Sequence, residues 1–248
     1  MPDLPVLSIC VPAFDERATV AAVIERLLAL RLPVPFEVVA VDDGSADGTA
    51  ALLREAAARS GGRVRALFHD RNRGKAAALS TAFAAARGEV LAVQDADLEY
   101  DPADLPRCLA PILEGRADAV FGSRFLPGSK REGAARLQVL ANRALTTLSN
   151  AFTGLRVTDM ETGRKLFLRK ALGPLPLRAE RFGVEPELCA RLAASGARVL
   201  ELPIAYHARG RAEGKKIGWR DGLEAAGWIA RTAPWPRRQA GSLVAHHV

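Results

Sequence analysis

Alternation between strand-like and helix-like segments in the first half of the chain limits its fold more than any other feature. Short apolar runs are each followed by a segment with apolar residues at helical spacing, and Gly, Pro or Asp marks the breaks. Repeated β-α units with short links predict an α/β fold, in which helices cover both faces of a mostly parallel central sheet. Ligands of such sheets bind at the carboxyl ends of the strands. The expected strands are 6–11, 37–41, 64–68, 90–93 and 119–121, and the expected helices are 18–30, 49–58, 76–86 and 105–113.

The second half of the chain has a less regular pattern. We expect a single domain over residues 1–233, divided at residue 124 into two halves, and a disordered tail over 234–248. The expected helices of the second half are 137–152, 187–194 and 222–231, the expected strands are 165–168 and 199–204, and a charged loop is expected at 209–216.

The net charge is +7 over 248 residues, and two basic stretches, 129–136 and 209–220, are more informative than this total. Basic patches attract the phosphate groups of nucleotides, lipid head groups or nucleic acids. Aromatic residues make up only 6% of the chain, and none is interleaved with the basic residues as a base-stacking platform requires. Nucleic acid is therefore not an expected partner.

Three cysteines, Cys10, Cys108 and Cys189, lie far apart and form no Cys-x-x-Cys pair, so neither a disulfide framework nor a zinc site is expected. A reducing cytoplasm is the simple interpretation. The N-terminus carries no signal-peptide pattern, and no apolar run approaches the roughly 20 residues needed to span a bilayer. We expect a cytoplasmic location, with any contact to lipid made at the membrane surface.

Asp95-Ala96-Asp97 directly follows the expected strand 90–93. Two carboxylates at the carboxyl end of a strand suit Mg²⁺ or Mn²⁺, and they leave coordination positions for diphosphate oxygens and water. Glu99 is a candidate for a third contact. Because an isolated Asp-x-Asp is also common in solvated acidic turns, it is the position after a buried strand that favours a metal site.

Asp43 lies in the sequence VDDGS (41–45), which ends the second expected strand. Its carboxylate can accept hydrogen bonds from a nucleobase imide or from ribose hydroxyls, while Ser45 or Asp47 could instead cap the following helix. The pattern from Asp43 also resembles the start of a calcium loop. Such a loop needs Glu at its twelfth position, where this chain has Arg54, so the calcium interpretation fails.

Polar, turn-forming residues also end the first and third expected strands, at 12–16 and 72–75. Four strand ends therefore converge on one rim of the sheet, which predicts a single ligand site there. Dinucleotide binding would require Gly-x-Gly-x-x-Gly after the first strand, and a phosphate loop would require Gly-x-x-x-x-Gly-Lys-Ser/Thr. Both patterns are absent.

These motifs occur in the same order in a known family. The segments PAFDE (12–16), VDDGSADGT (41–49), NRGK (72–75) and DADL (95–98) resemble the inverting family-two glycosyltransferases of GT-A fold. The segments GSR (122–124) and EGKKI (213–217) resemble the polyprenol-phosphate (dolichyl-phosphate) mannosyl- and glucosyltransferase branch. The resemblance covers residues from about 6 to about 220. One departure is Asp15, where the family usually has Asn.

The resemblance implies a role for each matching residue. Residues 1–124 would bind a nucleotide sugar, GDP-mannose or UDP-glucose, and residues 125–233 would bind a polyprenyl phosphate acceptor of the transferred hexose. Guanidinium groups suit both phosphates, because their planar fork binds phosphate through two hydrogen bonds. The nucleoside pocket would contain Pro12, Glu16, Asp43 and Lys75; Asp95, Ala96 and Asp97 would form the metal motif, with Glu99 as a further ligand; Arg124, Arg136 and Arg209 would face phosphate; Asp97, Arg124 and Arg209 would act in catalysis; and Lys215 and Lys216 would belong to a loop that closes over the phosphates.

The identity of the acceptor decides whether a general base is needed. A phosphate monoester is largely anionic near neutral pH and needs no strong base, whereas a hydroxyl acceptor does. Asp159, Glu185 and Glu187 are the candidates for such a base. Two alternatives stay open: a glycosyltransferase that acts on a hydroxyl of a polysaccharide, glycolipid or small glycoside, and a non-catalytic nucleotide-sugar-binding protein.

The last expected helix, 222–231, has apolar and basic residues that would also suit the surface of a membrane. Trp219, Trp228 and Ile229 are the apolar residues that suggest this interpretation. Because the apolar face is short, ordinary packing of the helix on the domain is favoured.

Overall fold

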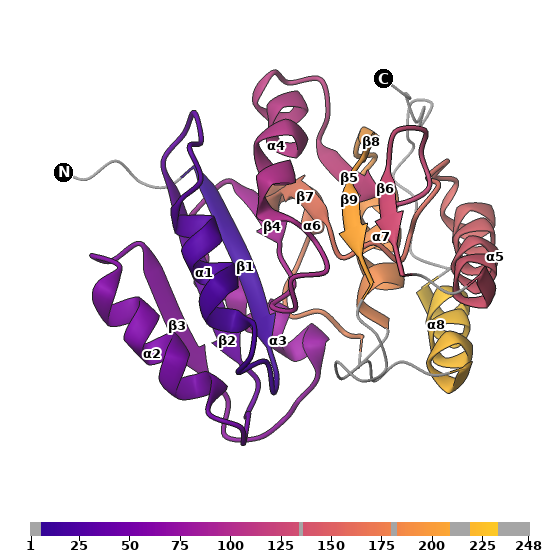
Figure 1. The fold of residues 1–248 in the computed structure, drawn as a ribbon. Coiled ribbons are helices and arrows are strands. Elements are labelled where there is room, and N and C mark those ends of the chain that lie inside the picture. The colour runs from indigo at the N-terminus through magenta and orange to yellow at the C-terminus, as the bar shows by residue number, and fades with distance from the viewer. Residues whose placement is uncertain (1–5, 134–135, 180–182, 209–218, 233–248) are drawn as a thin grey trace.

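The computed structural model describes residues 6–133, 136–179, 183–208 and 219–232, whose arrangement Figure 1 shows. The elements are β1 (Leu7–Ala13), α1 (Val20–Leu28), β2 (Phe36–Asp42), α2 (Thr49–Arg59), β3 (Val64–Phe68), α3 (Lys75–Ala85), β4 (Val90–Val93), the 3₁₀ helix η1 (Pro102–Asp104), α4 (Leu105–Leu113), β5 (Ala119–Ser123), β6 (Lys130–Glu132), α5 (Arg136–Thr153), β7 (Lys165–Leu168), α6 (Arg169–Leu172), α7 (Val184–Ala194), β8 (Val199–Pro203), β9 (Ala205–His207) and α8 (Trp219–Thr232).

A seven-stranded sheet with the order β3-β2-β1-β4-β7-β5-β8 forms the centre of the molecule (Figure 1). The pairs β1–β2, β2–β3, β1–β4 and β5–β8 are parallel. Strand β7 is antiparallel to both of its neighbours, β4 and β5. The expected α/β fold with a mostly parallel sheet is therefore confirmed. A separate parallel pair, β6 with β9, lies beside it.

Two apolar clusters cover the two faces of the sheet, because successive side chains of a strand point to opposite faces. Ile9 and Val11 of β1 belong to the cluster that includes α1, α2 and α4, whereas Cys10 belongs to the cluster that includes α3, α6 and α7. Burial on both faces explains why the central strands are continuous apolar runs rather than alternating ones.

All helices and strands expected from the pattern are present, with ends that differ by a few residues. Four short elements were not expected: η1, β6, β9 and α6. Strands β6 and β9 contain three residues each, and β6 is exposed throughout, so neither has the apolar pattern by which a strand is recognised. In the part of the chain that the structure describes, no helix is both long and apolar enough to span a bilayer.

Strand order reverses at β1, which has β2 on one side and β4 on the other. The chain moves outward from β1 through β2 to β3 and then returns to the opposite side of β1 as β4. In open α/β sheets such a reversal marks the place where ligands bind, outside the carboxyl ends of the strands. The motifs after β1, β2 and β4 all lie at this end.

Candidate functional site

Hydrogen bonds join the loops that follow β1 and β2. The backbone N–H of Asp15 donates to Oγ of Ser45 (2.9 Å), and Oδ1 of Asp15 accepts from the N–H of Ala46 (3.0 Å). The N–H of Glu16 donates to Oγ1 of Thr49 (2.9 Å). Asp15 has a φ of 52°, a left-handed conformation that Asp and Asn adopt more readily than most other residues. Asp15 therefore fits a position where the resembling family usually has Asn.

Pro12 and Glu16 lie at this joined rim, as their positions in the sequence predicted. Pro12 pairs in register with Val41 of the neighbouring strand and is half-buried. Oε2 of Glu16 accepts a hydrogen bond from the hydroxyl of Thr19 (3.0 Å). Their contact with a nucleoside stays a prediction.

Asp43 is buried directly after β2, and donors from loop 69–74 surround its carboxylate. The N–H of Arg73 donates to Oδ1 (3.0 Å) and Oδ2 (3.1 Å), and the N–H of Gly74 donates to Oδ2 (2.7 Å). Nδ1 of His69 lies 2.6 Å from Oδ1, and its Nε2 lies 2.9 Å from Oγ1 of Thr81. Asp43 thus holds the turn before α3, a role not expected from the sequence, while its contact with a base or ribose stays a prediction.

Lys75, the first residue of α3, bridges two carboxylates from distant parts of the chain. Its Nζ lies 2.9 Å from Oδ1 of Asp95, after β4, and 3.0 Å from Oε1 of Glu185, on α7. Burial alone would lower the pKa of Lys75, but the negative charges of Asp95 and Glu185 raise it well above the usual value. Lys75 therefore remains positively charged and ties the two halves of the chain together at the site.

Asp95 and Asp97 are half-buried, while Ala96 between them is buried. Burial of Ala96 turns the two carboxylates away from the core, toward the carboxyl end of β4. Oδ1 of Asp97 accepts from the N–H of Glu99 (3.0 Å), which forms a tight turn with Leu98 at a φ of 63°. Two carboxylates that emerge together in this way fit a hard divalent cation.

Glu99 contacts the second half of the chain through both its side chain and its backbone. Its Oε2 accepts from the hydroxyl of Tyr206 (2.8 Å), and its carbonyl oxygen accepts from the N–H of His207 (3.0 Å). Over the described ranges, no three His, Cys, Asp or Glu side chains are grouped so that they could hold a metal. Tyr206 engages one oxygen of Glu99, and the role of Glu99 as a further metal ligand stays a prediction.

Loop 158–163 packs directly against Asp95. A Cβ atom at Gly163 would lie 2.1 Å from Oδ2 of Asp95, so only glycine fits this position. In the same loop, Oε1 of Glu161 is buried and has no hydrogen-bond partner among the described residues. Burial first, and then the charge of Glu185, raise the pKa of Glu161 to about 7. Sequence reasoning gave Glu161 no role in the site, because its neighbours are distant in the chain.

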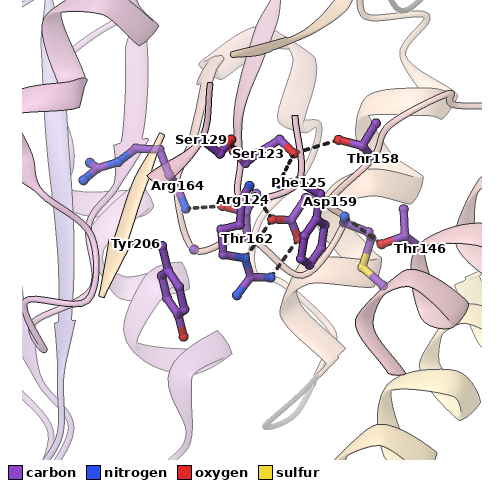
Figure 2. Close-up of polar contacts among 12 residues, drawn as sticks. Ser123, Arg124, Phe125, Ser129, Thr146, Thr158, Asp159, Thr162, Arg164 and Tyr206 are labelled. Atoms are coloured by element: carbon purple, nitrogen blue, oxygen red, sulfur yellow. Dashed lines mark hydrogen bonds and ion pairs between the residues drawn. The ribbon is translucent and has the colours of Figure 1, made fainter. Parts of the chain in front are cut away.

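Arg124 is buried and engages Asp159 through both arms of its fork (Figure 2). Its Nε donates to Oδ2 and its Nη2 to Oδ1 of Asp159, both at 2.7 Å, and its backbone N–H also donates to Oδ2 (3.0 Å). The guanidinium lies over the ring of Tyr206, 5.0 Å from its centroid. The expected role of Arg124 toward phosphate stays a prediction, and the structure adds a packing role that the motif did not reveal.

Two of the three candidate bases are occupied by structural hydrogen bonds. Asp159 is fully buried against Arg124. Glu187 is fully buried as well, and accepts from the backbone N–H groups of Arg178 and Ala179 and from Nε of Arg191. Carboxylates bonded to so many donors have little capacity left to accept a hydrogen bond from an acceptor hydroxyl.

Several residues expected at the site lie outside the described part of the chain. Arg209, Lys215 and Lys216 are among them, as is the expected tail over 234–248. Arg136 begins α5, but its side chain is not described.

In α8, Ile229 is buried and Trp228 packs against Gly183. This contact agrees with ordinary packing of the helix on the domain, the interpretation favoured from the sequence.

Comparison with known proteins places the chain among sugar-transferring enzymes. Residues 8–174 match the model of the family described as glycosyl transferase family 2. The dodecaprenyl-phosphate galacturonate synthase of Rhizobium johnstonii is 29% identical over 205 residues, which are 82% of this chain and 59% of that protein. The undecaprenyl-phosphate 4-deoxy-4-formamido-L-arabinose transferase of Aeromonas hydrophila subsp. hydrophila is 27% identical over 215 residues, 86% of this chain and 63% of that protein. The chain thus spans about three-fifths of the length of these relatives.

A solved structure supports the fold. Glucosyl-3-phosphoglycerate synthase from Mycobacterium tuberculosis, in complex with Mn²⁺, UDP-glucose and phosphoglyceric acid, superposes with a TM-score of 0.67. The alignment covers 94% of this chain and 81% of that one, at 22% identity. At this identity the similarity concerns the fold alone.

Proposed function

Because the chain belongs to glycosyl transferase family 2, we propose that it transfers a glycosyl group from a nucleotide sugar to a polyprenyl phosphate at a membrane surface. The observation that carries the proposal is the cluster of Lys75, Asp95 and Glu185 beside Asp97, at the point where the strand order reverses. The names of two relatives include polyprenyl phosphates. Mannose or glucose is the sugar expected from the resemblance, while those names point to galacturonate and a substituted arabinose.

Asp95 and Asp97 are the residues that would hold Mg²⁺ or Mn²⁺. A divalent ion there would offset the negative charge that develops on the departing nucleoside diphosphate. Lys75 adds a positive charge next to Asp95, and the missing side chain of Gly163 leaves room for that carboxylate. The similar glucosyl-3-phosphoglycerate synthase has been solved with Mn²⁺ and UDP-glucose together.

The state of the candidate bases supports a phosphate acceptor. Asp159 and Glu187 form structural hydrogen bonds, and Glu185 forms an ion pair with Lys75. An acceptor that is already anionic needs none of them. We assign the donor to residues 1–124 and the acceptor to residues 125–233, with Lys75 and Glu185 where the two halves meet.

The test measures transfer from a panel of UDP- and GDP-sugars to a short-chain polyprenyl phosphate, with products identified by mass. Asp97→Ala should lower the rate at least 10²-fold, since the diphosphate loses its counter-charge, and excess EDTA should do the same. Urea unfolding should show an intact fold in the variant. Full activity of Asp97→Ala, or in EDTA, would exclude the metal mechanism.

Glu161 favours one alternative, transfer to a hydroxyl group. A general base works best when its pKa lies near the working pH, and the pKa of Glu161 is about 7. The same polyprenol without its phosphate separates the two functions. Equal rates on both acceptors, together with a loss of activity in Glu161→Gln, would establish the hydroxyl reaction in place of the phosphate one.

A further inference from the structure

Helix α5 presents most of its apolar side chains to solvent, although Leu145 packs against the core and Val139 is half-buried. The described part of the chain has six large, exposed apolar residues, and four of them lie on α5: Leu137 (78% exposed), Leu140 (65%), Leu148 (38%) and Phe152 (39%). At 100° per residue these positions, with the exposed Ala141, Ala144 and Ala151 between them, fall on one continuous stripe. A helix on the surface of a globular protein normally has the opposite arrangement.

Beside Leu145, the inward face of α5 carries polar side chains that hold residues 157–160. Oγ1 of Thr146 accepts from the N–H of Met160 (3.1 Å). Nδ2 of Asn150 donates to the carbonyl oxygen of Val157 (2.7 Å), and Oδ1 of Asn150 accepts from the N–H of that residue (3.3 Å). These bonds fix the rotation of the helix, so its apolar stripe cannot turn inward.

Charge around the stripe favours a lipid surface as its partner. Helix α5 contains no Asp or Glu. Arg143 is exposed beside the stripe, and Arg156 is exposed just beyond the end of the helix. Arg131 and Arg143 both lie 5.4 Å from the ring centroid of Phe125, which gathers positive charge on the same side. Apolar residues flanked by cations suit the interface of an anionic membrane, where a helix inserts about 5–10 Å deep.

The size of the stripe is small for a contact between two copies of the chain. From Leu137 to Phe152 a helix extends about 22 Å, and its width is about 10 Å. This footprint of a few hundred Å² falls below the roughly 800 Å² per partner of a standard stable interface. Figure 1 shows α5 at the outer edge of the molecule, beside α8 and far from β3.

We propose that the apolar stripe of α5, formed by Leu137, Leu140, Leu148 and Phe152, inserts into the surface of an anionic membrane. The inference rests on the proposed function for its purpose: the helix that touches lipid also holds the segment that carries Asp159 and Glu161. Docking through α5 would bring the acceptor half of the site to a lipid phosphate. The sequence offered the last helix as an alternative for this contact while favouring its packing on the domain, and α8 does pack Ile229 and Trp228 against the protein.

The test uses sedimentation of the full chain with vesicles of phosphatidylglycerol and phosphatidylcholine. The double variant Leu137→Glu with Leu140→Glu should bind at least tenfold more weakly than the wild type. Leu148→Glu should show a smaller loss. Leu113→Glu is its matched control, because Leu113 is equally exposed at 38% but lies on α4, and it should bind like the wild type.

Two results would overturn the inference: wild-type binding by the double variant, or a wild-type dimer in ultracentrifugation that the same substitutions dissociate. Transfer assays separate this inference from the proposed function. The double variant should keep its rate on a water-soluble short-chain polyprenyl phosphate and lose it on a long-chain acceptor in vesicles. Absence of transfer to any phosphate acceptor in the wild type would refute the proposed function and leave the vesicle result to decide the role of α5.

Discussion

The Arg124–Asp159 pair and the Lys75–Asp95–Glu185 cluster join opposite charges at similar distances but in different surroundings. Asp159 is fully buried and accepts three hydrogen bonds from Arg124. In the Lys75 cluster, by contrast, every side chain keeps some contact with solvent, from 12% for Glu185 to 31% for Lys75.

This difference in exposure separates structural from functional roles. A saturated, buried pair cannot exchange a partner without leaving an uncompensated charge in the core. A half-exposed cluster can exchange one carboxylate contact for a ligand at little cost, because water screens the intermediate state. Burial and hydrogen-bond saturation, rather than charge itself, therefore indicate which of the two groups of charged residues can take part in chemistry.

Removing one partner of the buried Arg124–Asp159 pair should have the largest effect on stability. Arg124→Ala leaves the carboxylate of Asp159 buried and unpaired, which typically costs about 3–5 kcal/mol. Urea unfolding monitored by circular dichroism measures the free energy of unfolding.

The chain contains a matched control for this substitution. Arg198 binds Asp118 with the same pattern, through backbone N–H, Nε and Nη2, but with 57% of the Arg198 side chain exposed. Arg198→Ala should cost no more than about 1 kcal/mol, because exposed ion pairs contribute little. Equal losses in the two variants would mean that burial does not distinguish the two kinds of cluster.

Removing the positive charge of Lys75 from the Lys75–Asp95–Glu185 cluster should change activity more than stability. Lys75→Met leaves Asp95 and Glu185 without their shared cation, so the diphosphate would approach two uncompensated carboxylates. We expect kcat/KM for transfer to fall about 10²-fold, as for the loss of one preorganised charge-stabilising group, with a small change in unfolding free energy.

Lys170→Met, at an exposed position on α6, is the control and should leave both quantities unchanged. A Lys75→Met variant that unfolds much more easily yet transfers at the normal rate would contradict this expectation. The Lys75–Asp95–Glu185 cluster would then have a structural role.

The smallest expected effect concerns Glu161, which lies between the two clusters. Its pKa is raised from 4.5 to about 7 in the folded chain, so the stability present below pH 4.5 is lost as the pH rises through about 7. Glu161→Gln removes this contribution, and the unfolding free energy should fall less between pH 5 and pH 8 than in the wild type.

Glu201, also with a pKa raised to about 7, contributes equally in both proteins, so their difference isolates Glu161. Glu114→Gln, at an exposed carboxyl on the surface, should retain the wild-type slope. If the unfolding free energies of Glu161→Gln and the wild type changed with pH in parallel, the pKa of Glu161 would not be raised in the folded chain.

The fold was predictable because its information is local. Apolar periodicity located every long strand and helix, and strand order placed the motifs after β1, β2 and β4 at one rim. The roles of Lys75 and Arg124 were not predictable in full, since their partners Glu185 and Asp159 lie far along the chain. The antiparallel insertion of β7 and the β6–β9 pair likewise depend on tertiary contacts, for which a three- or four-residue segment has no signature of its own.

Two hydrogen bonds, from Tyr206 to Glu99 and from Lys75 to Glu185, affect how the protein can fold during its synthesis. These contacts join residues 107 and 110 positions apart. During synthesis, the turn after β4 would have left the ribosome long before either partner existed. Strands β1 to β4 could pair early, but the carboxylates after β4 would acquire their final positions only once the chain had grown past His207. A nascent or truncated chain that ends before Glu185 would therefore lack the contacts that hold Lys75 and Glu99.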